Sequence, residues 1–230
     1  MSLPQAVLFD FDGTLVHITI DFQAMRQGAV DVIHRYGESA EGGSRFTLEL
    51  VESVRDRLAQ RDPELAAAFQ RDALQSIRDV ELAAAQHAEP LPGVMDTLQW
   101  LSTHGIKVGI VTRNCRPAVL DVATRHGLCF DILLSRDDVT HVKPNPEHLL
   151  TGLRILGAAP AASIMVGDHP TDIQAAHGAG MVSVGITTTR PADQFDVVPD
   201  FMLDRMDSLI GLVSNGSWEE VAGRRSNGDG

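Results

Sequence analysis

Short apolar runs alternate with helical patterns along most of the chain, and this alternation limits the possible folds more than any other feature. The runs, which predict strands, lie at residues 7–10, 108–111, 132–135, 164–167 and 182–186, with a weaker one at 201–203. Helical patterns lie at residues 94–104, 118–126, 146–156 and 171–177, and several end at glycine. Strands and helices that alternate in this way form a parallel sheet with helices on both faces. The predicted fold class is therefore α/β, Rossmann-like.

Residues 17–89 interrupt the alternation, because they contain no strand-like run. Apolar residues instead recur at helical spacing over 21–36, 46–59 and 63–87. We therefore predict a helical cap domain at 17–89, inserted into an α/β core domain made of residues 1–16 and 90–214. Residues 215–230 are polar and rich in glycine, and we predict a disordered tail there.

Two carboxylates, Asp10 and Asp12, lie at the end of the first predicted strand. Residues two apart in a strand face the same way, so the pair would lie side by side. Carboxylates are rarely buried unless they are paired or bind a metal, and hard oxygen ligands suit Mg²⁺. Two solvated acids that cap the next element would give the same short pattern. The rest of the chain must therefore decide between the two interpretations.

Polar groups also follow later apolar runs. Thr112 and Arg113 follow the second predicted strand, and Lys143 lies in an irregular segment after the third. Asp168 and Asp172 follow the fourth strand, at its end and one helical turn later. Because the carboxyl ends of parallel strands meet at one edge of the sheet, where ligands bind, these groups are predicted to form one site.

The motifs that carry these groups are Asp10-Phe11-Asp12-Gly13-Thr14, Thr112, Lys143-Pro144 and Gly167-Asp168-x-x-x-Asp172. In order and spacing they resemble the motifs of the haloacid dehalogenase-like (HAD) phosphohydrolase superfamily, over residues 5 to about 190. The chain looks most like the phosphoglycolate-phosphatase-like subgroup, which has a helical cap after the first motif. The resemblance implies a Mg²⁺-dependent phosphatase that hydrolyses a small soluble phosphomonoester, phosphoglycolate-like or a sugar phosphate, through an aspartyl-phosphate. Many members have Asn directly after the second-motif Thr, whereas here Arg113 stands there and Asn114 follows.

The two acids of the first motif are the predicted catalytic residues. Asp10 is the nucleophile, since a carboxylate is a recognised covalent catalyst of this kind. Asp12 is the general acid and then the general base, because neighbouring carboxylates push their pKa values apart and the metal keeps Asp10 charged. The predicted metal ligands are Asp10, Asp12 and Asp168, and the resemblance implies that Asp12 contributes its backbone carbonyl.

The remaining motif residues are predicted to bind phosphate or to orient other groups. Thr112 would donate its hydroxyl to a phosphate oxygen, Arg113 could add a bidentate contact, and the resemblance places Lys143 beside the same group. We predict that Asp172 orients Lys143 or a metal-bound water. Alternatively, Asp172 has no role in the site and is simply an acid that the dipole of a helix N-terminus favours.

Composition excludes several classes of partner. The net charge of −12 disfavours binding to nucleic acid or to an anionic membrane. No apolar run approaches the roughly 18 residues that a membrane span needs, and no signal peptide is evident. The two cysteines lack metal-ligand spacing, which favours reduced thiols and a cytoplasmic location. We therefore expect a small-molecule phosphomonoester as the partner, and neither nucleic acid nor a membrane.

Three other functions are compatible with parts of this pattern. A phosphomutase of the same superfamily shares all four motifs. It differs in that its cap excludes water long enough for the phosphoryl group to return from the enzyme to the substrate. A 2-haloacid dehalogenase resembles the fold but needs neither a proton donor nor a cation, so Asp12 and Asp168 argue against it. A non-enzymatic phospho-acceptor signalling domain would have its modified acid well into the chain, whereas Asp10 is on the first strand.

Overall fold

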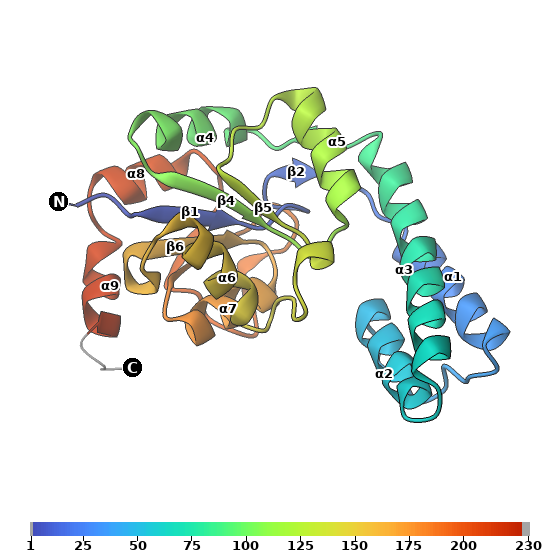
Figure 1. Cartoon of the computed structure of the whole chain (residues 1–230). Helices are drawn as coiled ribbons and strands as arrows, with labels where there is room; N and C mark the ends of the chain where they lie inside the picture. Colours follow the sequence, from blue (N-terminus) through green and yellow to red (C-terminus); the bar gives the residue numbers. More distant parts are fainter. Residues whose placement is uncertain (1, 227–230) are drawn as a thin grey trace. The chain divides into compact units, whose positions relative to one another are not determined.

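The computed structural model describes residues 2–226 and divides the chain into two compact units. The first contains Met1–Ile18 and Ala88–Gly230, and the second contains Thr19–His87. The second unit therefore begins after residue 18 and ends before residue 88, where the sequence predicted boundaries after 16 and before 90. Figure 1 shows both units in the colours of the sequence.

The larger unit is built on a parallel sheet, which within the described residues has six strands in the order β5-β4-β1-β6-β7-β8. The strands are β1 (Ala6–Phe9), β4 (Lys107–Val111), β5 (Ile132–Leu134), β6 (Ser163–Gly167), β7 (Val182–Ile186) and β8 (Phe201–Leu203). Apart from Lys107, every residue of β1, β4, β6 and β7 is buried. Burial on both faces explains why these strands are continuous apolar runs rather than alternating ones. The predicted α/β fold is confirmed.

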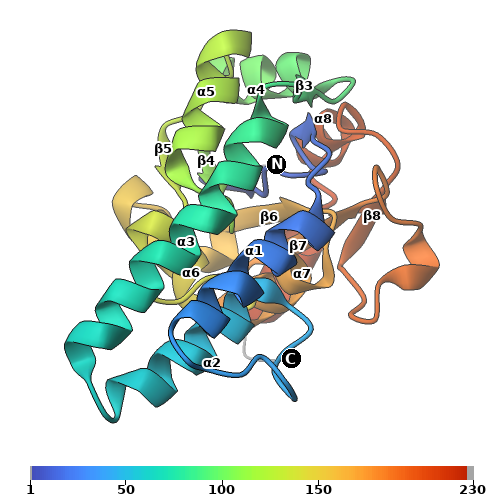
Figure 2. The ribbon, with the colours of Figure 1, turned by 90° about the vertical axis from the view of Figure 1, so that its right-hand side faces the viewer.

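Helices cover both faces of this sheet. Helices α4 (Val94–Thr103) and α5 (Arg116–His126) lie on one face, and α6 (Glu147–Leu156) and α7 (Pro170–Ala179) on the other (Figure 1 and Figure 2). Right-handed crossovers give this result, because the chain runs outward from β1 through β4 to β5 and then in the opposite direction through β6 and β7. The strand order therefore reverses beside β1, which is where open α/β sheets bind ligands.

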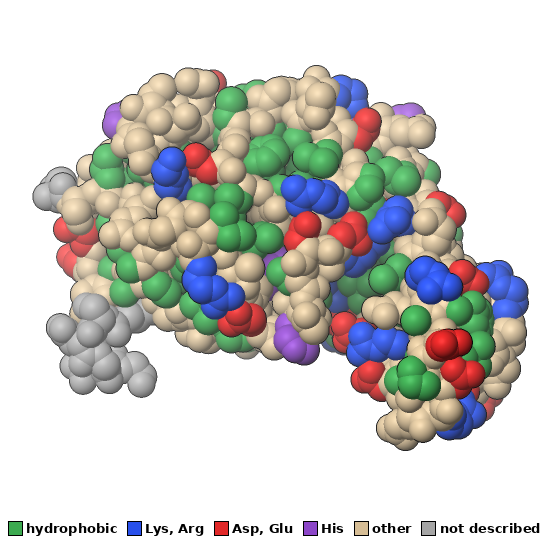
Figure 3. Space-filling model, in the orientation of Figure 1, with side chains coloured by type: hydrophobic (Ala, Val, Ile, Leu, Met, Phe, Trp, Pro, Cys, Tyr) green, Lys and Arg blue, Asp and Glu red, His purple; other side chains and the backbone are tan. Residues whose placement is uncertain are grey.

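The smaller unit consists of α1 (Phe22–Arg35), α2 (Thr47–Ala59) and α3 (Pro63–Ala85). Helix α3 packs against both of the others, and the three lie side by side in Figure 2. Their apolar faces enclose a core of their own that includes Ile33, Leu50 and Phe69. Acidic and basic side chains are interspersed over the visible face of this unit in Figure 3. The unit thus has the buried core and charged exterior of an independent helical domain.

The two connections between the units are paired with each other. Strand β2 (Val16–His17) and strand β3 (Glu89–Pro90) form a short antiparallel ladder in which His17 lies opposite Glu89. The sequence did not predict these strands, because a two-residue strand is too short to show a period. Their pairing holds the ends of the larger unit close together where the helical segment is inserted.

The predicted disorder of residues 215–230 is wrong for part of that range. Helix α8 (Ser208–Ser214) packs on α4, and after a turn the chain forms α9 (Glu219–Ser226). Trp218, only 3% exposed, anchors the turn between the two helices. A large buried side chain thus outweighs the polar composition of the segment. Residues 227–230 lie outside the described residues.

No helix within residues 2–226 combines the length and the apolar content that crossing a membrane requires.

Candidate active site

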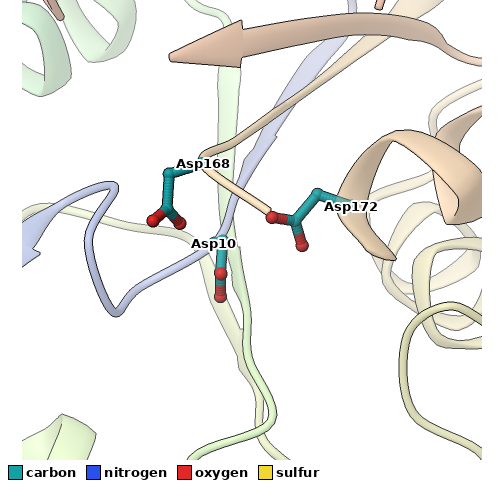
Figure 4. Close-up of side chains that lie close together, drawn as sticks. All are labelled: Asp10, Asp168 and Asp172. Atoms are coloured by element: carbon teal, nitrogen blue, oxygen red, sulfur yellow. The ribbon is translucent and has the colours of Figure 1, made fainter. Parts of the chain in front are cut away.

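Three carboxylates converge at the carboxyl edge of the sheet. Asp10 directly follows β1, Asp168 directly follows β6, and Asp172 lies in the first turn of α7. One carboxylate oxygen from each lies within 4.8 Å of the others. Figure 4 shows the three side chains close together at this edge. The parallel register that places β1 beside β6 therefore brings the first and last motifs together.

Lys143 is the cation at the centre of this cluster. Its side chain is 1% exposed, and Nζ lies 2.8 Å from Asp10 Oδ1 and 2.7 Å from Asp172 Oδ1. Burial opposes the charged form, but Asp10 and Asp172 outweigh it and raise the pKa of the lysine above its usual value. A charged ammonium group is therefore held against the carboxylate of Asp10.

Asp172 is fully buried, and both of its carboxylate oxygens have partners. Oδ1 contacts Lys143, and Oδ2 accepts a hydrogen bond of 3.1 Å from the backbone N–H of His169. Burial, and next the charge of Asp10, raise the pKa of Asp172 to about 7. A Cβ at Gly167 would lie 2.2 Å from Asp172 Oδ2, so any larger residue there would displace the carboxylate. The glycine before Asp168 is thus required by the position of Asp172.

Asp168 is held by two hydroxyl groups that the sequence analysis did not single out. Thr14 donates to Oδ1 over 3.2 Å, and Thr189 donates to Oδ2. Burial, and next the charge of Asp10, raise the pKa of Asp168 to about 6. Gly13 adopts a φ of +78°, and a Cβ there would lie 2.4 Å from Asp168 Oδ2. Gly13 is therefore needed both for its backbone conformation and for space beside the carboxylate.

The donor set fits a divalent cation with oxygen ligands. Three carboxylates share one buried ammonium, and burial, followed by the charge of Asp10, raises the pKa values of Asp168 and Asp172. Lys143 and His169 N–H occupy both oxygens of Asp172. In the described part of the chain, Asp168 has only neutral hydroxyl partners, and Asp10 is engaged through Oδ1. Asp10 and Asp168 are therefore the better candidates for direct ligands, and their oxygens suit Mg²⁺.

Asp12, the second acid of the first motif, is held by an amide from the second motif. Asn114 Nδ2 donates to Asp12 Oδ1 over 2.9 Å and to Oδ2 over 3.2 Å. Asn114 is 2% exposed, and its own Oδ1 accepts from the backbone N–H of Cys115, which fixes the orientation of the amide. In the sequence, Asn114 stands out only as a displaced motif residue. Its position as an amide shortly after a predicted strand could have marked it as a candidate site residue.

Thr112 and Arg113 follow β4 on the same edge of the sheet. Thr112 is buried, and its Oγ1 accepts a hydrogen bond of 3.0 Å from the backbone N–H of Asn114. That contact leaves the hydroxyl proton of Thr112 available to another acceptor. Arg113 is half-buried, and its backbone carbonyl accepts from Arg136 Nη1 over 2.9 Å. The structure thus brings all four motifs to one edge, with Asp12 beside Asn114 and Lys143 between Asp10 and Asp172.

The sequence model of the family described as haloacid dehalogenase-like hydrolase matches residues 7–186. The chain belongs to this family. The match covers β1 through β7 and therefore includes all four motifs and the helical segment. The resemblance inferred from the motifs is confirmed, and the chain is a hydrolase of the HAD family with the phosphoglycolate-phosphatase-like architecture.

Curated relatives of similar length are named pyrophosphatases. The chain is 33% identical over 219 residues to pyrophosphatase PpaX of Bacillus pumilus, covering 92% of this chain and 97% of the relative. It is 30% identical over 214 residues to pyrophosphatase PpaX of Bacillus cereus, covering 91% and 96%. The similarity therefore extends over both units and not only over the motif-bearing sheet.

Solved structures show the same fold. A HAD phosphatase from Thermococcus onnurineus matches with a TM-score of 0.60 at 26% identity, covering 90% of this chain and 97% of that chain. A predicted phosphoglycolate phosphatase from Haemophilus somnus matches with a TM-score of 0.62 at 21% identity, covering 92% and 99%. The second likeness, at its lower identity, concerns the fold alone.

Proposed function

We propose that the chain is a Mg²⁺-dependent phosphatase that hydrolyses a small phosphomonoester, phosphoglycolate-like or a sugar phosphate, through an aspartyl-phosphate on Asp10. The observation that carries the proposal is the pairing of Lys143 Nζ with Asp10 Oδ1 at 2.8 Å, at the edge where the other motifs meet. A carboxylate that attacks a phosphate dianion meets like-charge repulsion. That repulsion is about 4 kcal/mol per charge pair at about 4 Å and an effective dielectric constant near 20. A buried ammonium beside the nucleophile offsets part of it.

The contacts of Asp10 select the attacking oxygen. The backbone N–H of Phe11 donates to Asp10 Oδ1 over 2.7 Å, and Lys143 contacts the same oxygen. Neither contact uses Oδ2, so we assign the attack on phosphorus to Oδ2. The Oδ2–P bond forms as the bond from phosphorus to the ester oxygen breaks. The electron pair of that bond leaves with the ester oxygen.

Asp12 supplies the proton in this step and removes one in the next. In its protonated form it gives its proton to the leaving alkoxide, and the alcohol departs. Asp12 then accepts a proton from a water molecule as the water oxygen attacks phosphorus, which breaks the Oδ2–P bond and returns Asp10 as a carboxylate. Asn114 donates to both oxygens of Asp12, and this holds the carboxyl group in one orientation through both steps.

The proposed ligands for Mg²⁺ are the side chains of Asp10 and Asp168 and the backbone carbonyl of Asp12. A bound Mg²⁺ would neutralise phosphate charge and add to the electrostatic stabilisation of the transition state. Thr14 and Thr189 hold Asp168 for this role, and Asp172 holds Lys143. Thr112 and Arg113 are the proposed donors to the phosphate oxygens, together with Lys143.

Chelator should abolish hydrolysis of p-nitrophenyl phosphate, and added Mg²⁺ should restore it. If Mg²⁺ binds only the folded state, it should increase the free energy of unfolding by about 2.7 kcal/mol at a concentration of about 100 times its Kd. The melting temperature should rise accordingly. The measurement is phosphate release and thermal unfolding over a panel of phosphoglycolate, sugar phosphates and pyrophosphate, with and without Mg²⁺. Full turnover in chelator would refute the metal assignment, and rapid turnover of a 2-haloacid would refute the reaction class. Isomerised sugar phosphate without phosphate release would favour a phosphomutase.

Inorganic pyrophosphate is a second candidate substrate. The relatives with 33% and 30% identity over more than nine-tenths of the chain are named pyrophosphatases. In pyrophosphate the leaving group is a second phosphate rather than an alcohol, and the chemistry at Asp10 is otherwise the same.

We also propose a cytoplasmic location. Neither Cys115 nor Cys129 forms a disulfide within the described residues, which is usual for proteins of a reducing compartment.

We also propose that the helical unit Thr19–His87 is a cap that selects among substrates. Because His17 and Glu89 are paired across β2 and β3, a short Gly/Ser linker from Ile18 to Ala88 should close the chain without strain. The shortened protein should fold and should bind Mg²⁺ weakly. It should lose most discrimination among phosphomonoesters, measured as the spread of kcat/KM over the panel. An unchanged ranking of substrates would place specificity in the larger unit.

A further inference from the structure

The loop after β7 is attached to two of the four motifs. Thr188 donates its hydroxyl to the backbone carbonyl of Gly13, and Thr189 donates to Asp168 Oδ2. The family match ends at residue 186, so this loop lies beyond the matched region. Thr188 and Thr189 therefore hold this loop at the catalytic edge.

A pocket of about 500 Å³ opens along this loop, lined by Thr187, Thr188, Thr189, Arg190, Pro191 and Ala192. Its volume is within the range of small-ligand sites, which is roughly 300–1,000 Å³. Its charged lining residue is Arg190, and the threonines add hydroxyl groups. A polar pocket with a single cation and several hydroxyls suits a small hydrated anion better than an apolar group.

Arg190 is half-buried, and its own protein contacts do not satisfy it. Its Nε is shielded from solvent and has no hydrogen-bond partner within the described residues. A shielded donor without an acceptor is unfavourable, and a guanidinium is well shaped to bind a phosphate or carboxylate through two parallel hydrogen bonds. Arg190 therefore offers an unused anion-binding group.

Arg190 also lies close to the catalytic edge along the chain. Arg190 directly follows Thr189, whose hydroxyl holds Asp168. Arg190 is thus placed on the same edge of the sheet as the acid cluster.

We propose that Arg190 and the loop 187–192 form a second anion subsite, which binds the distal anionic group of a substrate that carries one phosphoryl group at Asp10 and another anionic group beyond it. This inference rests on the proposed phosphatase function, and it narrows the substrate to a two-headed anion. Pyrophosphate carries a phosphate as the second group, and phosphoglycolate carries a carboxylate. The shared chemistry is a planar or tetrahedral oxyanion that a guanidinium group can bind.

The test compares Arg190→Gln with Arg154→Gln. Arg154 is an exposed arginine in the last turn of α6 that pairs with Glu147 and does not line the pocket, so its replacement removes the same charge elsewhere. We measure kcat/KM for pyrophosphate, for phosphoglycolate and for p-nitrophenyl phosphate, which has no second anionic group. Arg190→Gln should lower the ratio of either two-headed substrate to p-nitrophenyl phosphate by about ten- to a hundredfold, the usual effect of losing a charge-assisted contact. The two-headed substrate whose kcat/KM ratio falls more shows whether the subsite prefers a phosphate or a carboxylate as the distal group.

A binding experiment separates this inference from the proposed function. The Kd of methylenediphosphonate, a non-hydrolysable two-headed anion, is compared with that of methylphosphonate in the presence of Mg²⁺. The wild-type protein should bind the first more tightly, and Arg190→Gln should remove most of that advantage, while Arg190→Lys keeps part of it. Equal affinities in the wild-type protein, or equal losses for all ligands in Arg190→Gln, would overturn the subsite. Absence of any phosphatase activity with a retained preference for methylenediphosphonate would refute the proposed function and leave the subsite standing.

Discussion

Asp10→Asn is expected to reduce turnover to less than about a thousandth of the wild-type kcat while leaving the fold intact. An amide oxygen is a poor nucleophile, so the covalent route is closed. The amide keeps the local structure, because its oxygen can still accept the hydrogen bond that Phe11 N–H now donates to Oδ1. Lys143 loses one of its two carboxylate partners but keeps Asp172 at 2.7 Å. The loss should therefore be in chemistry and not in folding.

Two measurements check this expectation. Phosphate release gives the residual kcat, and mass spectrometry of protein quenched in acid should detect a phosphorylated aspartate in the wild-type protein and none in Asp10→Asn. The matched control is Asp96→Asn, which removes an exposed carboxylate from the first turn of α4 and should keep full activity. Turnover above about a thousandth in folded Asp10→Asn would mean that another group attacks phosphorus.

The strands and helices were predictable because each is a local pattern. The apolar runs at 182–186 and 201–203 coincide with β7 and β8, and the helical pattern at 94–104 ends one residue beyond α4. A strand buried on both faces is largely apolar, as β7 is apart from Ser183, so its limits are visible in the sequence. The convergence of the motifs was predictable for the same reason, since groups at the carboxyl ends of parallel strands share one edge.

The side-chain pairings inside the site were not predictable. Thr189 holds Asp168 across 21 residues, and Asn114 holds Asp12 across 102. Nothing in the local sequence indicates either contact, because each depends on which strands become neighbours and on the rotamers that packing allows. A search for hydroxyl and amide side chains just after every predicted strand would have included both residues, but it would not have paired them with their acids.

The requirement for glycine at two positions also appears only in three dimensions. Gly13 belongs to the first motif and adopts a positive φ. The space that it leaves is occupied by Asp168, and the space at Gly167 is occupied by Asp172. Each glycine therefore makes room for an acid from the last motif. Such steric reasons are invisible until the first and last motifs are placed side by side.

Asp12→Asn is expected to slow the phosphorylation of Asp10 by an alkyl phosphate about a hundredfold or more, and to slow that by p-nitrophenyl phosphate much less. An alkoxide is a strong base and needs a proton as it leaves, whereas p-nitrophenolate leaves readily without one. The substitution keeps the local structure, since an amide oxygen at residue 12 can still accept from Asn114 Nδ2. The role of Asp12 therefore predicts a dependence on the leaving group that a purely structural role does not.

The comparison must be made in a single turnover, because Asp12 also acts when water cleaves the aspartyl-phosphate. Rapid mixing of excess enzyme with each substrate, followed by detection of the released alcohol, isolates the first step. Asn114→Ala provides the matched variant. It keeps the acid but removes the amide that orients it. Asn114→Ala should therefore also slow phosphorylation more for the alkyl phosphate than for p-nitrophenyl phosphate, but by a smaller factor than Asp12→Asn. Equal losses for both substrates in Asp12→Asn would remove the general-acid role. If the losses instead follow leaving-group basicity, Asp12 protonates the leaving oxygen and Asn114 holds it in position to do so.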